Sequence, residues 1–125
     1  MDLVRILIMI EAKGRNGSVS FDGGFICIRR SGLLARMTVG RGEKKIPVAA
    51  VTSLQWKSPD LWYAGYIEFS IAGGNEVRSQ FGHATRDAAG NENAVLFDKG
   101  QMPAFEAIRT EIEHAIATYH KGREK

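Results

Sequence analysis

The sequence predicts a mainly β domain of the α+β class, closed by one C-terminal amphipathic helix. Three observations lead to this. Turn signals recur at short spacing up to about residue 76, the segments between them alternate apolar and polar residues, and the stretch after residue 101 changes to a helical period. A chain of 125 residues fits one compact domain, which we expect to span residues 1–125.

The strands are expected between glycine-containing turns. Asn16-Gly17, Asp22-Gly23-Gly24 and Gly73-Gly74 are dipeptide patterns that tolerate the positive φ of tight hairpins. Alternating or β-branched segments lie beside these turns and predict strands with one buried and one solvated face, at residues 18–21, 25–30, 64–72, 77–81 and 94–97. Several short strands at this spacing indicate an antiparallel sandwich or barrel.

The C-terminal helix is expected over about residues 102–121. Pro103 suits the first helical turn, and Lys121-Gly122 form a natural end. Apolar side chains recur every three or four residues and form one stripe, namely Phe105, Ile108, Ile112, Ile116 and Tyr119. Such a stripe must be buried on the sheet.

The N-terminal residues 1–13 contain an apolar run whose β-branched content favours an extra strand, with a short helix as the alternative. The run is shorter than the roughly 20 apolar residues of a membrane span, and no small-residue cleavage site follows it. Cys27 is the single cysteine, which suits a reducing compartment. We therefore expect a soluble cytoplasmic protein.

A strongly bent antiparallel sheet or barrel, plugged at one end by the helix, would satisfy these elements. This is the architecture of pleckstrin-homology-like domains. The strings "RRSGLLARMTVGRGEKKIPVAAVTSLQWK", "GYIEFSIAGGNEVRSQFG", "DAAGNENAVLF" and "QMPAFEAIRTEIE" occur in this order, and through them the chain resembles a bacterial, mainly actinobacterial, family of unknown function. The resemblance covers roughly residues 12–118 and implies a pleckstrin-homology-like fold without implying an activity.

Charge is distributed unevenly along the chain. Residues 1–57 hold ten Lys and Arg against four acids, and the remainder holds seven against ten. Such asymmetry attracts phosphates or anionic lipid, or drives head-to-tail self-association. A solvated surface of mixed charge is the third interpretation.

Basic residues concentrate around "VGRGEKKIPV". The candidate anion-binding residues are Arg29, Arg30, Arg36, Arg41, Lys44 and Lys45, which could meet phosphate through charge-assisted hydrogen bonds. The resemblance also points this way, since eukaryotic pleckstrin-homology domains bind inositol phosphates with basic residues on the first hairpin. Consecutive strand residues point to opposite faces, however, so only about half of these charges could converge. The alternative is a turn followed by an edge strand that lysines protect, with Ile46 in the core.

The segment "WKSPDLWYAGY" provides a second candidate site. Leu61, Trp62 and Tyr63 follow a Ser-Pro-Asp turn signal. Either they insert into a protein partner or a membrane interface, or they fold back over the open end of the barrel. Trp56 is expected in the core or against the helix.

No catalytic, cofactor-binding or metal-binding pattern stands out. The sequence lacks a P-loop and a G-x-S-x-G elbow. The oxygen-bearing residues between Asp87 and Asn93 do not match an EF-hand, and the three histidines form no metal motif. Cys27 is expected to be a small core residue. We expect neither an enzyme nor a cofactor.

The remaining expectation is a non-catalytic binding or scaffolding module that acts through protein–protein contact and self-associates. The alternative is binding of anionic lipid headgroups or phosphorylated ligands through the basic residues. A net charge of +3, without aromatic residues interleaved among the basic ones, argues against nucleic acid.

Overall fold

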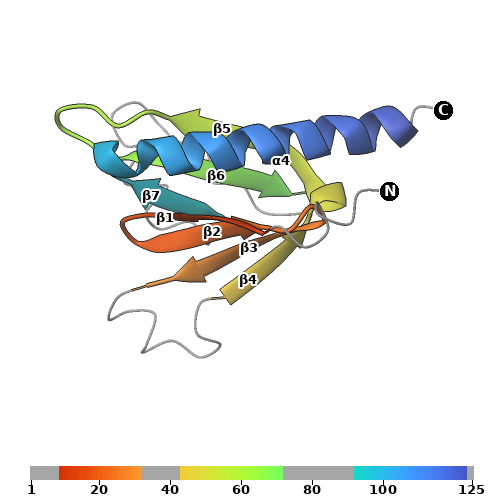
Figure 1. Cartoon of the computed structure of the whole chain (residues 1–125), viewed down its shortest axis with the longest axis horizontal. Helices are drawn as coiled ribbons and strands as arrows, with labels where there is room; N and C mark the ends of the chain where they lie inside the picture. The colour runs from red at the N-terminus through yellow and green to blue at the C-terminus, as the bar shows by residue number, and fades with distance from the viewer. Residues whose placement is uncertain (1–8, 32–42, 72–91, 124–125) are drawn as a thin grey trace.

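The computed structural model describes residues 9–31, 43–71 and 92–123. Two antiparallel sheets and one long helix make up the fold (Figure 1). The four-stranded sheet contains β1 (Ile10–Lys13), β2 (Gly17–Phe21), β3 (Phe25–Arg30) and β4 (Glu43–Pro47), and the three-stranded sheet contains β5 (Val51–Lys57), β6 (Gly65–Ile71) and β7 (Ala94–Phe97). The short helix η1 (Val48–Ala50) joins the sheets, and η2 (Lys99–Gln101) leads into α4 (Met102–Arg123).

The predicted mainly β fold with one C-terminal helix is confirmed, but the predicted closed barrel is wrong for the described residues. Strands pair in sequence order within each sheet, and no described ladder joins β1 to β7. In the described residues, hydrogen bonds link the two sheets near the β1–β2 turn, where the Arg15 amide donates to the Leu96 carbonyl at 2.7 Å and the Asn16 side chain accepts from the Leu96 amide at 2.9 Å. These bonds do not continue into a ladder between β1 and β7, so the wall formed by the described strands is open.

The β2–β3 turn shows how the sequence specifies one hairpin. Gly23 has φ +102°, a conformation that glycine adopts without strain. The Asp22 carboxylate accepts from the backbone amides of Gly24 and Phe25 at 2.9 and 2.8 Å. These two bonds lower the pKa of Asp22. The predicted Asp-Gly-Gly turn thus fixes the register of β2 against β3.

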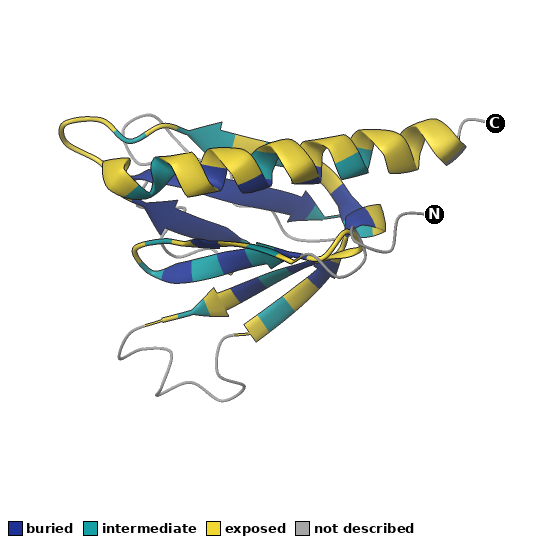
Figure 2. Cartoon of the chain, in the orientation of Figure 1, coloured by how far each residue is buried: buried dark blue, intermediate teal, exposed yellow. Residues whose placement is uncertain are grey.

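The core lies between the sheets and α4. Phe105, Ile108 and Ile112 on the helix are completely buried, and the Phe105 ring stacks on Phe97 of β7 with centroids 4.5 Å apart. Further along, Ile116 is only half-buried, and the exposed part of the helix begins there (Figure 2). Tyr119, the last residue of the predicted stripe, is exposed. The C-terminal part of α4 therefore extends beyond the sheet that its first part covers.

Trp56 on β5 contacts both the core and the helix. Its ring lies 5.0 Å from Phe97, and the Arg109 guanidinium of α4 lies 4.7 Å from its centroid. This cation–π contact covers the outer edge of the core, where β5 is the last strand of its sheet.

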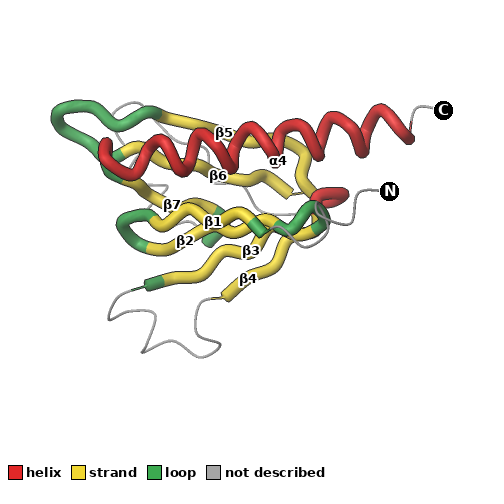
Figure 3. The backbone as a smooth tube through the Cα atoms, in the orientation of Figure 1, coloured by secondary structure: helices red, strands yellow, loops and turns green. Residues whose placement is uncertain are grey.

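The β1–β2 turn, the β5–β6 loop and the start of α4 lie at one end of the molecule, and the β2–β3 turn and η1 lie at the other (Figure 3). Residues 10–13 form a strand; residues 1–8 and the strand predicted at 77–81 lie outside the described residues. Within the described ranges, no helix has the length and apolar content of a membrane span.

Candidate interaction site

The loop between β5 and β6, residues 58–64, is held in one conformation by Asp60. Its carboxylate oxygen Oδ1 accepts hydrogen bonds from the backbone amides of Trp62 and Tyr63 at 2.8 and 2.7 Å. The Asp60 amide donates in return to the Tyr63 carbonyl at 3.0 Å. The two bonds to the carboxylate lower the pKa of Asp60, with a smaller contribution from Lys57. Three bonds thus close a compact turn.

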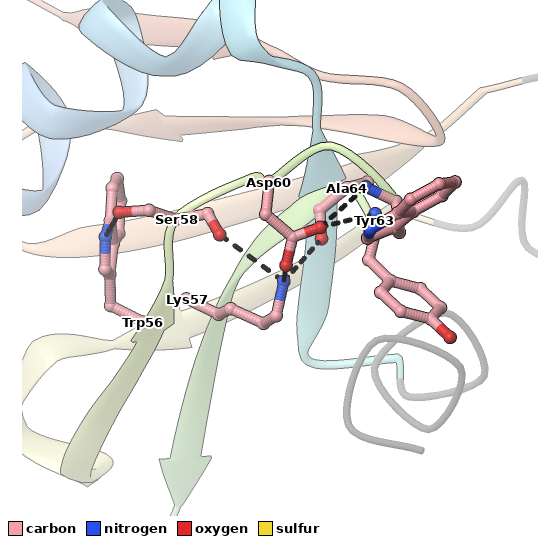
Figure 4. A network of polar contacts seen from close by, with 7 residues as sticks. Trp56, Lys57, Ser58, Asp60, Tyr63 and Ala64 are labelled. Carbon is pink, nitrogen blue, oxygen red and sulfur yellow. Dashed lines mark hydrogen bonds and ion pairs between the residues drawn. The ribbon is translucent and has the colours of Figure 1, made fainter. Parts of the chain in front are cut away.

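Lys57 ties both ends of this turn together (Figure 4). Its ammonium lies 3.4 Å from the Asp60 carboxylate and donates to the carbonyls of Ser58 and Ala64, each also at 3.4 Å. It also lies 5.9 Å from the centroid of the Tyr63 ring. One flexible cation therefore links the residues that enter and leave the loop.

The base of the loop is packed closely. A Cβ atom at Gly65 would lie 2.5 Å from the Lys57 carbonyl and 2.7 Å from the Pro59 ring, so no larger residue fits there without movement of the backbone. Trp56 donates its indole N–H to the Ser58 hydroxyl at 3.2 Å. The loop is thus anchored to β5 and β6 on both sides.

The apolar side chains at the tip project away from this base. Leu61 is 92% exposed, Trp62 84% and Tyr63 55%. The alternative in which these residues fold back over the sheets is therefore wrong, and the reason is local. With Asp60 capping the turn, the chain reverses before these side chains can reach the core.

Charged groups surround the loop at its own end of the molecule. A small cavity of about 180 Å³ separates it from Arg15 of the β1–β2 turn and from Asp98 and Lys99 before α4. Arg15 and Asp98 form an ion pair at 3.8 Å, with both side chains more than half exposed. Such a pair adds little stability but keeps the surroundings of the apolar tip polar.

The four predicted anion-binding residues that the structure describes do not all lie on one face of their sheet. Arg29 and Lys45 lie on the outer face of their sheet, whereas Lys44 lies on the inner face beside Ile46. Arg30 is half-buried, and this burial lowers its pKa. Two of the six, Arg36 and Arg41, lie outside the described residues.

Two of these cations already have carboxylate partners. Arg29 Nε lies 2.7 Å from Glu43 Oε2, and Lys44 Nζ lies 2.6 Å from Glu92 Oε1. The Lys44 contact, and to a smaller degree Arg30, lowers the pKa of Glu92. The sequence predicts that consecutive basic residues point to opposite faces of the sheet. The described part of the cluster has this arrangement.

Asp60 and Lys13 are the positions to which sequence reasoning gave no site role. The Ser-Pro-Asp signal marked a turn, but it did not reveal that the carboxylate fixes the orientation of Trp62. Lys13 lies opposite Ser18 on the neighbouring strand. The Asn16-Gly17 turn between them is the sequence signal that could have indicated this pair.

Metal-binding chemistry has little support in the described residues. No group of three or more His, Cys, Asp or Glu side chains gathers there in a way that could hold an ion. Cys27 is a free, half-buried thiol on β3, less buried than predicted. Most of the loop considered for calcium, including Asp87 and Asn91, lies outside the described residues.

The profile of a family described as "Domain of unknown function (DUF4429)" matches residues 19–113. The chain belongs to this family. The match runs from within β2 into α4 and thus includes the 58–64 loop and strands β3 to β7, while β1 lies before it. No curated protein and no solved structure shows significant similarity to the chain.

Proposed function

We propose that this member of the DUF4429 family is a non-catalytic, cytoplasmic binding module with a pleckstrin-homology-like architecture, and that it associates with further copies of itself. Four strands, then three strands, then one C-terminal helix packed over the open wall support the architectural part of the proposal. The contact surface in this proposal is the Leu61–Trp62–Tyr63 tip of the 58–64 loop.

The observation that carries the proposal is the combination of exposure and rigidity at this tip. Trp62 is 84% exposed although its backbone amide is fixed by Asp60. Ordering a flexible loop on binding opposes association, so a tip that is ordered beforehand retains more of its contact energy. Trp and Tyr are also enriched among the few residues that contribute most to protein interfaces.

A second copy of the chain is the partner that the charge distribution favours. Three cations (Lys57, Arg15 and Lys99) and two carboxylates (Asp60 and Asp98) surround the apolar tip, which leaves a small positive excess. The first half of α4 exposes Glu106 and Glu111, while its Glu113 pairs with Arg109. A contact between the loop end of one copy and the helix of another would place opposite charges together around an apolar centre. Such a heterologous contact forms rings or open chains.

Light scattering coupled to size-exclusion chromatography tests this proposal over a range of protein concentrations. The wild-type chain should show mass above that of a monomer, and high salt should reduce it because exposed charges are screened. Trp62→Ser should weaken association by about 2 kcal/mol or more, roughly thirty-fold in the dissociation constant. Phe25→Ser is the matched control, since Phe25 is another exposed aromatic residue and lies on β3, outside the 58–64 loop.

Two results would contradict the proposal. A wild-type monomer at every concentration and at both low and high salt removes self-association. Association that Phe25→Ser abolishes and Trp62→Ser leaves intact removes the loop as the contact surface. Circular dichroism of each variant checks that it remains folded.

A further inference from the structure

The strand register places two cations and a hydroxyl in one line across the first sheet. Lys13 of β1 pairs with Ser18 of β2, and Ser18 pairs with Arg29 of β3. All three project from the outer face, because the residues adjacent to them in sequence, such as Ala12, Val19 and Ile28, are buried. We call these three residues the Lys13–Ser18–Arg29 row.

The spacing of this row suits a tetrahedral anion. Neighbouring strands lie about 4.8 Å apart, so the backbones of Lys13 and Arg29 are roughly 10 Å apart with Ser18 between them. Two long side chains separated by that distance can approach the same phosphate from both sides, while the short Ser18 leaves space above the central strand. A hydroxyl and two cations are all hydrogen-bond donors to phosphate oxygens.

A cavity lies over the row. Its volume is about 300 Å³, and it is lined by all three members of the row together with Gly14, Gly17, Arg30 and Ser31. The two glycines contribute only backbone, and Ser31 adds a second hydroxyl. The volume exceeds that of one phosphate group and leaves space for part of the molecule to which the phosphate is attached.

The charges in this cavity remain available to a ligand. Arg29 hydrogen-bonds with the Cys27 side chain and pairs through Nε with Glu43, but the guanidinium carries five N–H donors and its side chain is 64% exposed, which leaves donors for a ligand. Lys13 is exposed and forms no ion pair within the described ranges. Arg30 also lines the cavity, but its side chain starts on the inner face of β3 with Ile26 and Ile28, so its charge is not counted in the row.

We propose that the Lys13–Ser18–Arg29 row binds the phosphate group of a phosphorylated ligand, either a lipid headgroup or a soluble phosphate ester. The site uses one residue of the predicted basic cluster and two residues outside it. It is separate from the Leu61–Trp62–Tyr63 tip, so self-association and phosphate binding can fail independently. Lys44 and Lys45 are not part of it.

Two binding measurements on the full chain distinguish the sources of the phosphate. The first is an NMR titration of the ¹⁵N-labelled protein with pyrophosphate and with glycerol 3-phosphate at low ionic strength. The second is co-sedimentation with phosphatidylcholine vesicles, with and without phosphatidic acid. The variants are Lys13→Ala, Arg29→Ala, the double variant and Ser18→Ala. Lys121→Ala is the control, since it removes the same charge from the exposed end of α4.

The site predicts shifts for the amides of residues 13–18 and 29–31. Each single cation variant should weaken binding about ten-fold or more, because each removes one hydrogen-bonded charge. Ser18→Ala should weaken it a few-fold, and Lys121→Ala should change it less than about two-fold. If the protein binds the soluble probes but not the vesicles, the ligand is a soluble phosphate ester. If it binds vesicles only when they contain phosphatidic acid, and the double variant loses this binding, the ligand is a lipid headgroup. Absence of binding in both assays, or binding that the double variant retains, overturns the proposal.

Discussion

Replacement of Phe105 by alanine should be among the most destabilising single changes in the helix. The Phe105 side chain has no exposed surface, and its ring stacks on Phe97. From α4 the ring reaches the place where Gly14 packs against the Leu96 carbonyl. A Cβ atom added at Gly14 would lie 3.0 Å from the Phe105 ring. Surroundings this closely packed have little freedom to collapse into the space that the ring leaves.

The expected loss follows from the buried volume. Phe→Ala in a core costs about 3–5 kcal/mol, and Ile112→Ala should cost about 2–5 kcal/mol. Tyr119→Ala should cost less than about 0.5 kcal/mol, because that side chain is already 37% exposed and lies beyond the sheet. The predicted order is therefore Phe105, then Ile112, then Tyr119, although all three occupy one helical stripe.

Urea unfolding followed by circular dichroism measures these differences. With a slope of about 1–3 kcal/mol per molar urea, the Phe105→Ala midpoint should fall by roughly 1–3 M or more. If this variant does not fold, Phe105→Leu, with an expected cost below about 1.5 kcal/mol, keeps the comparison possible. Equal losses for Ile112→Ala and Tyr119→Ala would refute the claim that the sheet covers only the first part of α4.

Three further predictions concern the loop and the inner face. Gly65→Ala should lower the free energy of unfolding by more than about 1 kcal/mol, because its Cβ would meet backbone atoms. Gly100→Ala is the control: a Cβ there meets open space, so the free energy of unfolding should change by less than about 0.5 kcal/mol in the same urea assay. Because the pKa of Asp60 is lowered, its carboxylate stabilises the loop fully above the ordinary value of 3.8 and loses this effect as pH falls through the folded-state pKa. The NMR shifts of the loop amides should therefore titrate with a midpoint below 3.8. A midpoint at or above 3.8 contradicts the capping bonds. Lys44→Met should raise the pKa of Glu92 towards 4.5 in a carboxylate NMR titration, and an unchanged pKa would show that the ion pair does not persist in solution.

Several elements were predictable because their signals are local. The hairpin at Asp22-Gly23-Gly24 needs positive φ and a capping carboxylate, and both are written in adjacent residues. The stripe on α4 follows from the helical period, and its residues Phe105, Ile108 and Ile112 are buried as expected. In each case the residues that cooperate lie within a few positions of one another, so periodicity and turn chemistry were sufficient.

The candidate site was predictable only in part for the same reason. The sequence indicated that Leu61, Trp62 and Tyr63 follow a turn, but two orientations were equally compatible with it. The orientation depended on the bonds from Asp60 and on the close contact of Gly65 with Pro59. For the basic cluster, the structure adds what the sequence did not show: Arg29 and Lys44 lie on different faces of the sheet, and each pairs with an acid.

The sequence by itself determined the β-rich class, the terminal helix and the helical stripe that faces the sheet, because local period and turn residues control these features. How much of that stripe is buried depended on where the sheet ends, since Tyr119 is exposed. Tertiary structure alone decided that the described part of the wall stays open beyond the contact of Arg15 with Leu96, and that Asn16 bonds to Leu96, 80 positions away in the sequence. The physical reason is register. Residues that face one another across strands are selected by the hydrogen-bond ladder and by the turns that start it, and their separation along the chain leaves no linear pattern.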